Sequence, residues 1–117
     1  MPHLRVFNQT KQILLCSVCK VAQSDQERTR GLLDRTSMQA GEGLLIPKCD
    51  SVHTVGMKFP IDVLYLGRNG TVVAGRLNMQ PGQKAQRIST GSLSVLELPS
   101  GGALSTEVGD QIMFTRL

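Results

Sequence analysis

The chain has 117 residues, of which 40% are hydrophobic and 19% are charged, so it has the size and composition of one globular domain with its own core. The net charge of +4 comes from 13 basic and 9 acidic residues, and the basic residues are scattered along the chain. This pattern favours a solvated surface and argues against a specific nucleic-acid interface. We therefore expect a single domain over residues 1–117 with no specific nucleic-acid partner.

The N-terminal sequence and the cysteine count bear on the compartment. Residues 1–6 lack the long apolar stretch of an export signal, and no apolar run in the chain is long enough to span a bilayer. Three cysteines are an odd number, which does not suit the disulfide framework of a secreted domain. These features predict a cytoplasmic protein, with export as the alternative if a leader was removed before Met1.

In the first half of the chain, two strands are predicted over residues 5–8 and 12–19. The clearest helix signal follows, because Ser24 and Glu27 have the spacing of a capping box. We expect the helix to run from Asp25 to Arg35, with Gly31 inside it at a close approach to a neighbouring strand. A short buried strand is then predicted over residues 44–46 and should end at Pro47.

In the second half, Asn69 and Gly70 separate two runs rich in β-branched residues, 61–66 and 71–77. This arrangement predicts a hairpin, because both turn residues tolerate a positive φ. Pro81-Gly82 predicts a type II turn, and strands are expected over residues 85–88, 94–98 and 111–115. About eight short strands and one helix predict a mostly β fold, α+β by strict count, in which a small barrel or sandwich is covered by the helix. No β–α–β alternation is visible, so a doubly wound fold is not expected.

Several segments, taken together, resemble the family called domain of unknown function 192. They are residues 28–35, 43–45, 51–62, 70–73, 96–101 and 109–110. The resemblance covers about Cys19 to Phe114 and implies a compact β-rich domain with no established biochemical activity. Many relatives carry aromatic residues just before the position of Met57, where this chain has Val55-Gly56. If those aromatic residues line a pocket in relatives, the pocket is wider or differently filled in this protein.

The segment from His53 to Asp62 is the predicted functional edge, because it is polar and rich in turn residues where a strand would otherwise be expected. Met57 could form an adaptable apolar wall, while charged and polar side chains provide hydrogen-bond donors and acceptors. This mixture suits a small polar ligand or a peptide or protein partner. We therefore interpret the chain as a non-catalytic binding or accessory domain without a cofactor. The predicted binding residues are His53, Thr54, Met57, Lys58, Asp62 and Glu97.

Two other functions are considered. The first is a hydrolase in which Cys49, His53 and Asp62 act together, although residues four apart on an extended segment lie roughly 13 Å from each other. The second is a zinc-stabilised module with the Cys₃His set Cys16, Cys19, Cys49 and His53. On a regular strand Cys16 and Cys19 would face opposite ways, so core cysteines are the favoured interpretation.

Structural roles are also favoured for three acidic residues that lie in or beside apolar stretches. Glu97 is expected to face water from its strand, and Asp110 is expected to be a turn residue hydrogen-bonded to its own backbone. Asp62, the third, is the acidic residue most suited to pairing with His53 or Lys58.

Overall fold

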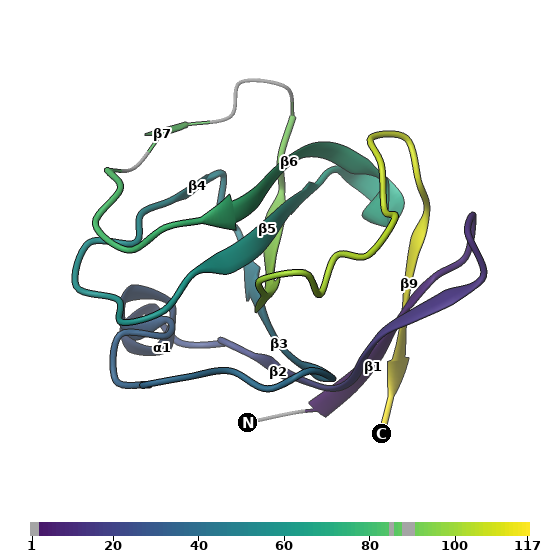
Figure 1. The fold of residues 1–117 in the computed structure, drawn as a ribbon. Coiled ribbons are helices and arrows are strands. Elements are labelled where there is room, and N and C mark those ends of the chain that lie inside the picture. The colour runs from purple at the N-terminus through teal and green to yellow at the C-terminus, as the bar shows by residue number, and fades with distance from the viewer. Residues whose placement is uncertain (1–2, 85, 88–90) are drawn as a thin grey trace.

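The computed structural model describes residues 3–84, 86–87 and 91–117. Within these residues, a seven-stranded sheet curls into a half-barrel in the strand order β6-β5-β8-β3-β2-β1-β9, and β4 pairs separately with β7 (Figure 1). The mostly β prediction is confirmed. The elements are β1 His3–Asn8, β2 Ile13–Val21, α1 Asp25–Arg30, β3 Glu42–Pro47, β4 Ser51–Val52, β5 Ile61–Leu66, η1 Arg68–Gly70, β6 Val72–Met79, β7 Gln86–Arg87, β8 Ser94–Pro99 and β9 Ile112–Arg116.

The central strands β5 and β8 are buried on both faces, since side chains pack against each side of the sheet. Leu64 and Leu66 of β5 point into the inner core, which lies inside the curl, whereas Val63 and Tyr65 point into the outer core on the other face. This alternation follows from the two-residue period of a strand. The inner core contains Val6, Leu15, Cys16, Cys19, Leu64, Leu66, Val72, Leu96, Leu98, Ala103 and Ile112. The outer core contains Ala22, Leu32, Leu44, Ile46, Val52, Met57, Ile61, Val63, Tyr65, Met79 and Val95.

The capping box at the start of α1 is confirmed. The Glu27 N–H donates to Ser24 Oγ and the Ser24 N–H donates to Glu27 Oε1, both at 3.0 Å. The predicted end at Arg35 is wrong, because Gly31 lies after the helix and not inside it. Gly31 has φ 51° and ψ −119°, a conformation that a side chain disfavours and that interrupts the helical hydrogen-bond series.

Helix α1 lies in the connection between β2 and β3, which pair in parallel. Parallel neighbours require a crossover connection, so this segment forms a β–α–β unit that the sequence analysis did not predict. The other strand pairs of the large sheet are antiparallel. After the helix, Leu32 enters the outer core.

Tight turns and one closing contact shape the ends of the sheet. The predicted turn after β5 is confirmed, with φ 61° at Asn69 and 78° at Gly70. At the same end the sheet edges meet, because the Val72 N–H donates to the Asp110 carbonyl at 2.9 Å and the Gly109 N–H donates to the Val72 carbonyl at 2.8 Å. Of the strand predicted over residues 85–88, β7 forms the middle, and Ala85 and Ile88 lie outside the described residues.

The acidic residue at this closing contact is held by several donors. Asp110 Oδ2 accepts hydrogen bonds from Asn8 Nδ2 at 2.9 Å, Lys11 Nζ at 2.7 Å and the Glu107 N–H at 3.0 Å. These bonds, that of Asn8 above all, lower the pKa of Asp110 to about 2. The expected turn role of Asp110 therefore matches its contacts. Across the described ranges, no helix has the length and apolar character needed to cross a membrane.

Candidate functional site

The predicted functional edge lies between β3 and β5 and covers part of the outer core. Val52 and Met57 anchor it there, since both side chains are buried. The chain is extended around β4, so its side chains alternate in direction: Val52 and Thr54 are buried, whereas His53 between them is exposed. His53 therefore stands at the rim of whatever space lies beneath the segment.

A cavity of about 70 Å³ lies between this segment, the end of α1 and the sheet. We call it the Glu97 cavity, and its lining includes Arg28, Cys49, His53, Met57 and Glu97. A cavity of this volume accommodates about two water molecules or one ligand group of similar size. Three of the six predicted binding residues thus meet at one concave site.

Glu97 provides the least expected feature of this cavity. On β8 it lies opposite Leu44 of β3 and Val63 of β5, so its side chain faces the outer core and is only 4% exposed. The expectation that Glu97 faces water is wrong, because β8 is covered on both faces. Burial alone raises the pKa of Glu97 to about 7. Within the described residues, no group donates a hydrogen bond to this carboxyl group.

A second polar group lies on the same face of the sheet. The Tyr65 hydroxyl is buried and makes no hydrogen bond within the described part of the chain, although it lies close enough to the Arg76 guanidinium for that charge to act on it. Burial, the dominant influence, raises the pKa of Tyr65. Arg76 Nη1 is likewise buried without a hydrogen-bond partner within the described residues, so the Tyr65 hydroxyl, the Arg76 guanidinium and the Glu97 carboxyl group all have unmet hydrogen-bonding capacity on this face.

Cys49 is half-buried at the cavity and is not activated as a nucleophile. Its Sγ donates a hydrogen bond to the Ser51 carbonyl at 3.0 Å, and burial raises the pKa of the thiol. A nucleophilic cysteine instead requires a lowered pKa, usually from a cationic neighbour. The thiol thus stays protonated near neutral pH.

Asp62 is not part of this site. Its carboxylate is 2% exposed and accepts three backbone N–H groups, from Asn78 at 2.8 Å and from Gly101 and Ala103 at 3.0 Å. These bonds connect β5 and β6 to the chain that follows β8. The structure therefore does not bring together the hydrolase set of Cys49, His53 and Asp62.

Thr54 and Lys58 are also outside the cavity. Thr54 Oγ1 donates to the Gln80 carbonyl at 2.5 Å and accepts from the Gln83 N–H at 2.9 Å, so it holds the loop that follows β6. Lys58 is exposed and does not line the cavity. Arg28 lines the cavity but was not predicted as a site residue, because its position there depends on where α1 packs.

The four residues of the zinc alternative lie in two separate places. Cys16 and Cys19 are both fully buried in the inner core, so the expectation that they face opposite ways is wrong. From the Leu4–Cys19 pair to the Val6–Cys16 pair, β1 advances by two residues whereas β2 advances by three. This β-bulge turns both thiols to the same side of the strand. Cys49 and His53 line the cavity on the outer face, and no cluster of three or more metal-ligating side chains occurs within the described residues.

The two thiols of β2 interact with each other. Cys16 Sγ donates to the Gly41 carbonyl at 3.2 Å and Cys19 Sγ donates to the Lys20 carbonyl at 3.5 Å. The neighbouring Cys16 thiol, together with burial, raises the pKa of Cys19. Both sulfur atoms lie over Gly43, where a Cβ would be 2.8 Å from Cys16 Sγ. The glycine therefore provides the space that the thiol pair occupies.

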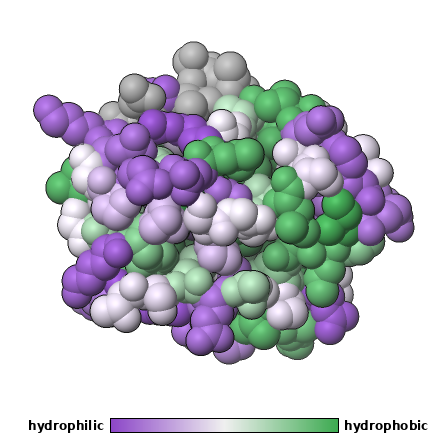
Figure 2. Space-filling model, in the orientation of Figure 1, coloured by the Kyte–Doolittle hydropathy of each residue, from purple (hydrophilic) through white to green (hydrophobic). Residues whose placement is uncertain are grey.

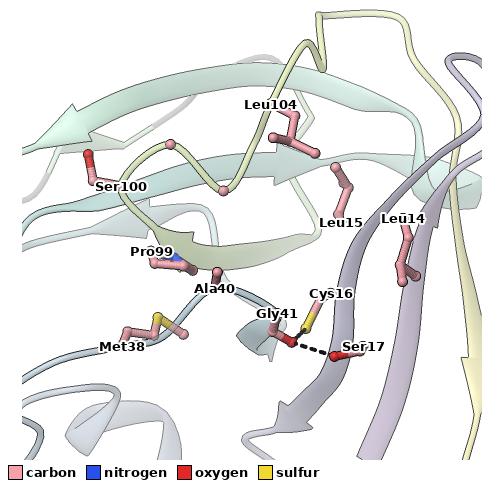
Figure 3. Close-up of a pocket in the computed structure, with 12 residues that line it drawn as sticks. Leu14, Leu15, Cys16, Ser17, Met38, Ala40, Gly41, Pro99, Ser100 and Leu104 are labelled. Carbon is pink, nitrogen blue, oxygen red and sulfur yellow. Dashed lines mark hydrogen bonds between the residues drawn. The ribbon is translucent and has the colours of Figure 1, made fainter.

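A second and larger pocket was not predicted from the sequence. Its volume is about 480 Å³, and it lies between β2, the segment around residues 38–41 and the turn that follows β8 (Figure 3). Leu15, Met38 and Leu104 come from these three parts of the chain. Because the apolar lining is divided among these three parts, no single stretch of sequence shows the pocket.

Comparisons with known proteins place the chain in a family. The model of the domain of unknown function 192 family, described as "Uncharacterized ACR", matches residues 6–114, so the chain belongs to this family. No curated protein matches the chain significantly.

Two solved structures share the fold. One, from Sinorhizobium meliloti 1021 and named a "putative transcription regulator", has a TM-score of 0.83 and 20% identity over 97% of this chain and 92% of its own. The other, a protein of unknown function from Novosphingobium aromaticivorans DSM 12444, has a TM-score of 0.80 and 21% identity over 95% of this chain and 83% of its own. At these identities the likeness shows the fold alone.

Proposed function

We propose that the protein is a non-catalytic binding domain whose ligand occupies the Glu97 cavity. The observation that supports this proposal is the buried Glu97 carboxyl group, which faces the cavity without a hydrogen-bond partner among the described residues. A buried polar group without a partner costs free energy. A ligand that donates a hydrogen bond to Glu97 would remove this cost.

The other polar groups of the cavity narrow the ligand class. Arg28 already interacts with the Asp25 carboxylate and with the Gln23 carbonyl, and the Cys49 thiol already donates to Ser51. Among the residues that line the cavity, Glu97 provides the one carboxylate, so it is the acceptor best suited to a cationic ligand. An ionised carboxylate only accepts hydrogen bonds, so the ligand should present N–H donors, as a small ammonium group does.

Size favours a small amine over a larger metabolite. The cavity accommodates about two water molecules, which matches a methylammonium-sized group. The tip of a lysine side chain from a peptide partner has the same chemistry, and an experiment must separate these two sources.

The proposal is tested by titrating the protein at pH 8 with methylammonium and following the Met57 methyl resonance by NMR. Saturable shifts are expected for methylammonium and not for tetramethylammonium, which has no N–H donor. Glu97→Gln should weaken the interaction at least tenfold. Glu107→Gln is the matched control, because the Glu107 side chain is 74% exposed, and it should leave the affinity within twofold.

Three outcomes would overturn the proposal. The first is no saturable shift for methylammonium, and the second is equal shifts for the two ammonium ions. The third is binding of Nα-acetyl-lysine amide, which keeps its ε-ammonium group, without binding of methylammonium. This result would indicate a peptide partner in place of the small ligand.

A further inference from the structure

The larger pocket beside β2 is a concave site without a charged wall. Its volume of about 480 Å³ falls within the roughly 300–1,000 Å³ of small-molecule sites. Residues from β2, from the segment before β3 and from the turn after β8 enclose it on three sides (Figure 3). None of the residues that line it is acidic or basic, so a charged ligand would find no counter-charge there.

The main polar group at one wall of the pocket already has its hydrogen bonds. The Gly41 carbonyl accepts from the backbone N–H groups of Ser17 at 3.0 Å and Val18 at 3.1 Å. It also accepts from Cys16 Sγ at 3.2 Å and Ser17 Oγ at 3.3 Å. This carbonyl has no lone pair left for a ligand.

Three hydrogen-bond donors of the turn after β8 also have partners within the protein. Ser100 Oγ donates to Asn78 Oδ1 at 2.7 Å, the Gly101 N–H donates to Asp62 Oδ2 at 3.0 Å, and the Gly102 N–H donates to the Pro99 carbonyl at 2.7 Å. A polar ligand would lose its hydrogen bonds to water and gain few from these walls. The pocket therefore favours an apolar ligand.

Large apolar side chains stand exposed around the opening. Leu14 is 47% and Leu104 is 56% exposed, and both line the pocket. Figure 2 shows hydrophobic side chains gathered where the connection between β8 and β9 passes beside β1 and β9. A ligand seated in the pocket would remove part of this apolar surface from water, which is the favourable term for binding.

We propose that this pocket binds a small, uncharged, apolar molecule, such as a ring system or a branched hydrocarbon. The site is separate from the Glu97 cavity, because its β2 side chains Leu15 and Cys16 belong to the inner core, whereas Glu97 faces the outer core. A molecule of this class is enclosed on three sides and needs no polar partner from the walls.

The test uses N-phenyl-1-naphthylamine, an uncharged dye whose fluorescence rises in apolar surroundings. We expect saturable binding of one dye per protein and NMR shifts at the Leu15 and Met38 methyl groups. Leu104→Lys should weaken binding at least tenfold by placing a charge at the opening, and Ala40→Phe should do the same by filling the pocket. Leu77→Lys is the matched control, because Leu77 is 58% exposed on β6 and lies outside the pocket, and it should change the affinity less than twofold.

Several results would overturn this inference. They are the absence of saturable binding by the folded protein, an equal loss of affinity in Leu104→Lys and Leu77→Lys, and shifts that map elsewhere. A dimer that forms without dye binding and is lost in Leu104→Lys would assign the pocket to a second copy of the chain. Glu97→Gln should leave the dye affinity within twofold. The proposal for this pocket and the proposal for the Glu97 cavity are therefore tested independently.

Discussion

The Glu97 carboxyl group makes stability depend on pH near neutrality. Its ordinary pKa of 4.5 applies in the unfolded chain, and burial raises the folded value to about 7. The folded state therefore holds a proton that the unfolded state releases. The contribution of this proton to the free energy of unfolding is fully present below pH 4.5 and is lost as the pH rises through about 7. The total change is on the order of 3 kcal/mol.

Glu97→Gln should remove this pH dependence and stabilise the protein above pH 7. Glutamine has nearly the same shape and never carries the charge that burial disfavours. Urea unfolding at pH 4.5, 6 and 8 measures the free energy of unfolding for both proteins. The assignment is refuted by an equal slope with pH in wild type and variant.

Asp62 and His53 lie in the same stretch of sequence but should respond oppositely to truncation. Asp62→Ala leaves three backbone N–H groups without their acceptor, so we expect a loss of about 3 kcal/mol or more. His53 is exposed, and His53→Ala should change stability by less than about 0.5 kcal/mol. Thermal unfolding compares the two variants.

His53→Ala should weaken methylammonium binding, because the imidazole lines the Glu97 cavity. A large loss of stability in this variant, with unchanged binding, would instead assign His53 to the scaffold. A small effect of Asp62→Ala would contradict the structural role of its carboxylate.

Among the elements, the short helix α1 depends on a glycine at its end. Gly31→Ala should destabilise the protein by about 1–3 kcal/mol, because a side chain disfavours the backbone conformation at φ 51°. The cost is conformational, since the nearest atom to an added Cβ is 3.9 Å away.

Gly75→Ala on β6 is the control for this prediction. Gly75 does not have a positive φ, and the nearest atom to its added Cβ is 3.6 Å away, so we expect a change within about 1 kcal/mol. Calorimetric unfolding of both variants provides the comparison. Equal destabilisation of the two variants would contradict this prediction, because it would show that the positive φ of Gly31 does not cause the effect.

Local signals explain which elements the sequence predicts well. The Ser24–Glu27 capping box and the Asn69-Gly70 turn act within three or four residues, so their outcome does not depend on distant parts of the chain. Gly31 is harder to interpret, because glycine occurs both inside helices and at their ends. The end of the helix therefore followed only from the structure, whereas its start at Asp25 was predicted from the capping box.

Features that depend on strand pairing were not predictable in this way. The directions of Cys16 and Cys19 depend on a bulge that is set by the register against β1, and the strand period alone gives the wrong answer. Glu97 is misread for a similar reason, because only pairing with β3 and β5 shows that its strand is covered on both faces. The segment from His53 to Asp62 was predicted as one functional edge, but tertiary contacts place His53 at the cavity and bind Asp62 to backbone groups elsewhere.

At the scale of the whole molecule, the two faces of the curled sheet provide different environments. The outer core has a small polar cavity under a covering segment, whereas the large apolar pocket borders the inner core. Since the two sites share no lining residue, occupation of one site need not require occupation of the other. A two-site binding domain is therefore compatible with a chain of this size.

The charge distribution of the whole surface argues against specific DNA binding. The chain has 13 basic residues. Within the described part of the chain, five of them form ion pairs with acidic side chains: Lys11, Arg28, Arg30, Arg35 and Arg87. Each pair lowers the positive potential that phosphates would meet. Four aromatic residues in the chain are also too few for a base-stacking surface.

We therefore expect only weak and salt-sensitive binding to DNA. Fluorescence anisotropy with a labelled 20-base-pair duplex should give a Kd in or above the micromolar range, about 10⁻⁶–10⁻⁴ M, at 150 mM salt. The affinity should fall steeply between 50 and 200 mM salt, because binding of this kind rests on counterion release. It should also be equal for unrelated duplex sequences, since phosphate contacts carry no sequence information. Sub-micromolar binding to one sequence at 150 mM salt, retained when unlabelled unrelated DNA is added in excess, would contradict this expectation and require a base-reading surface.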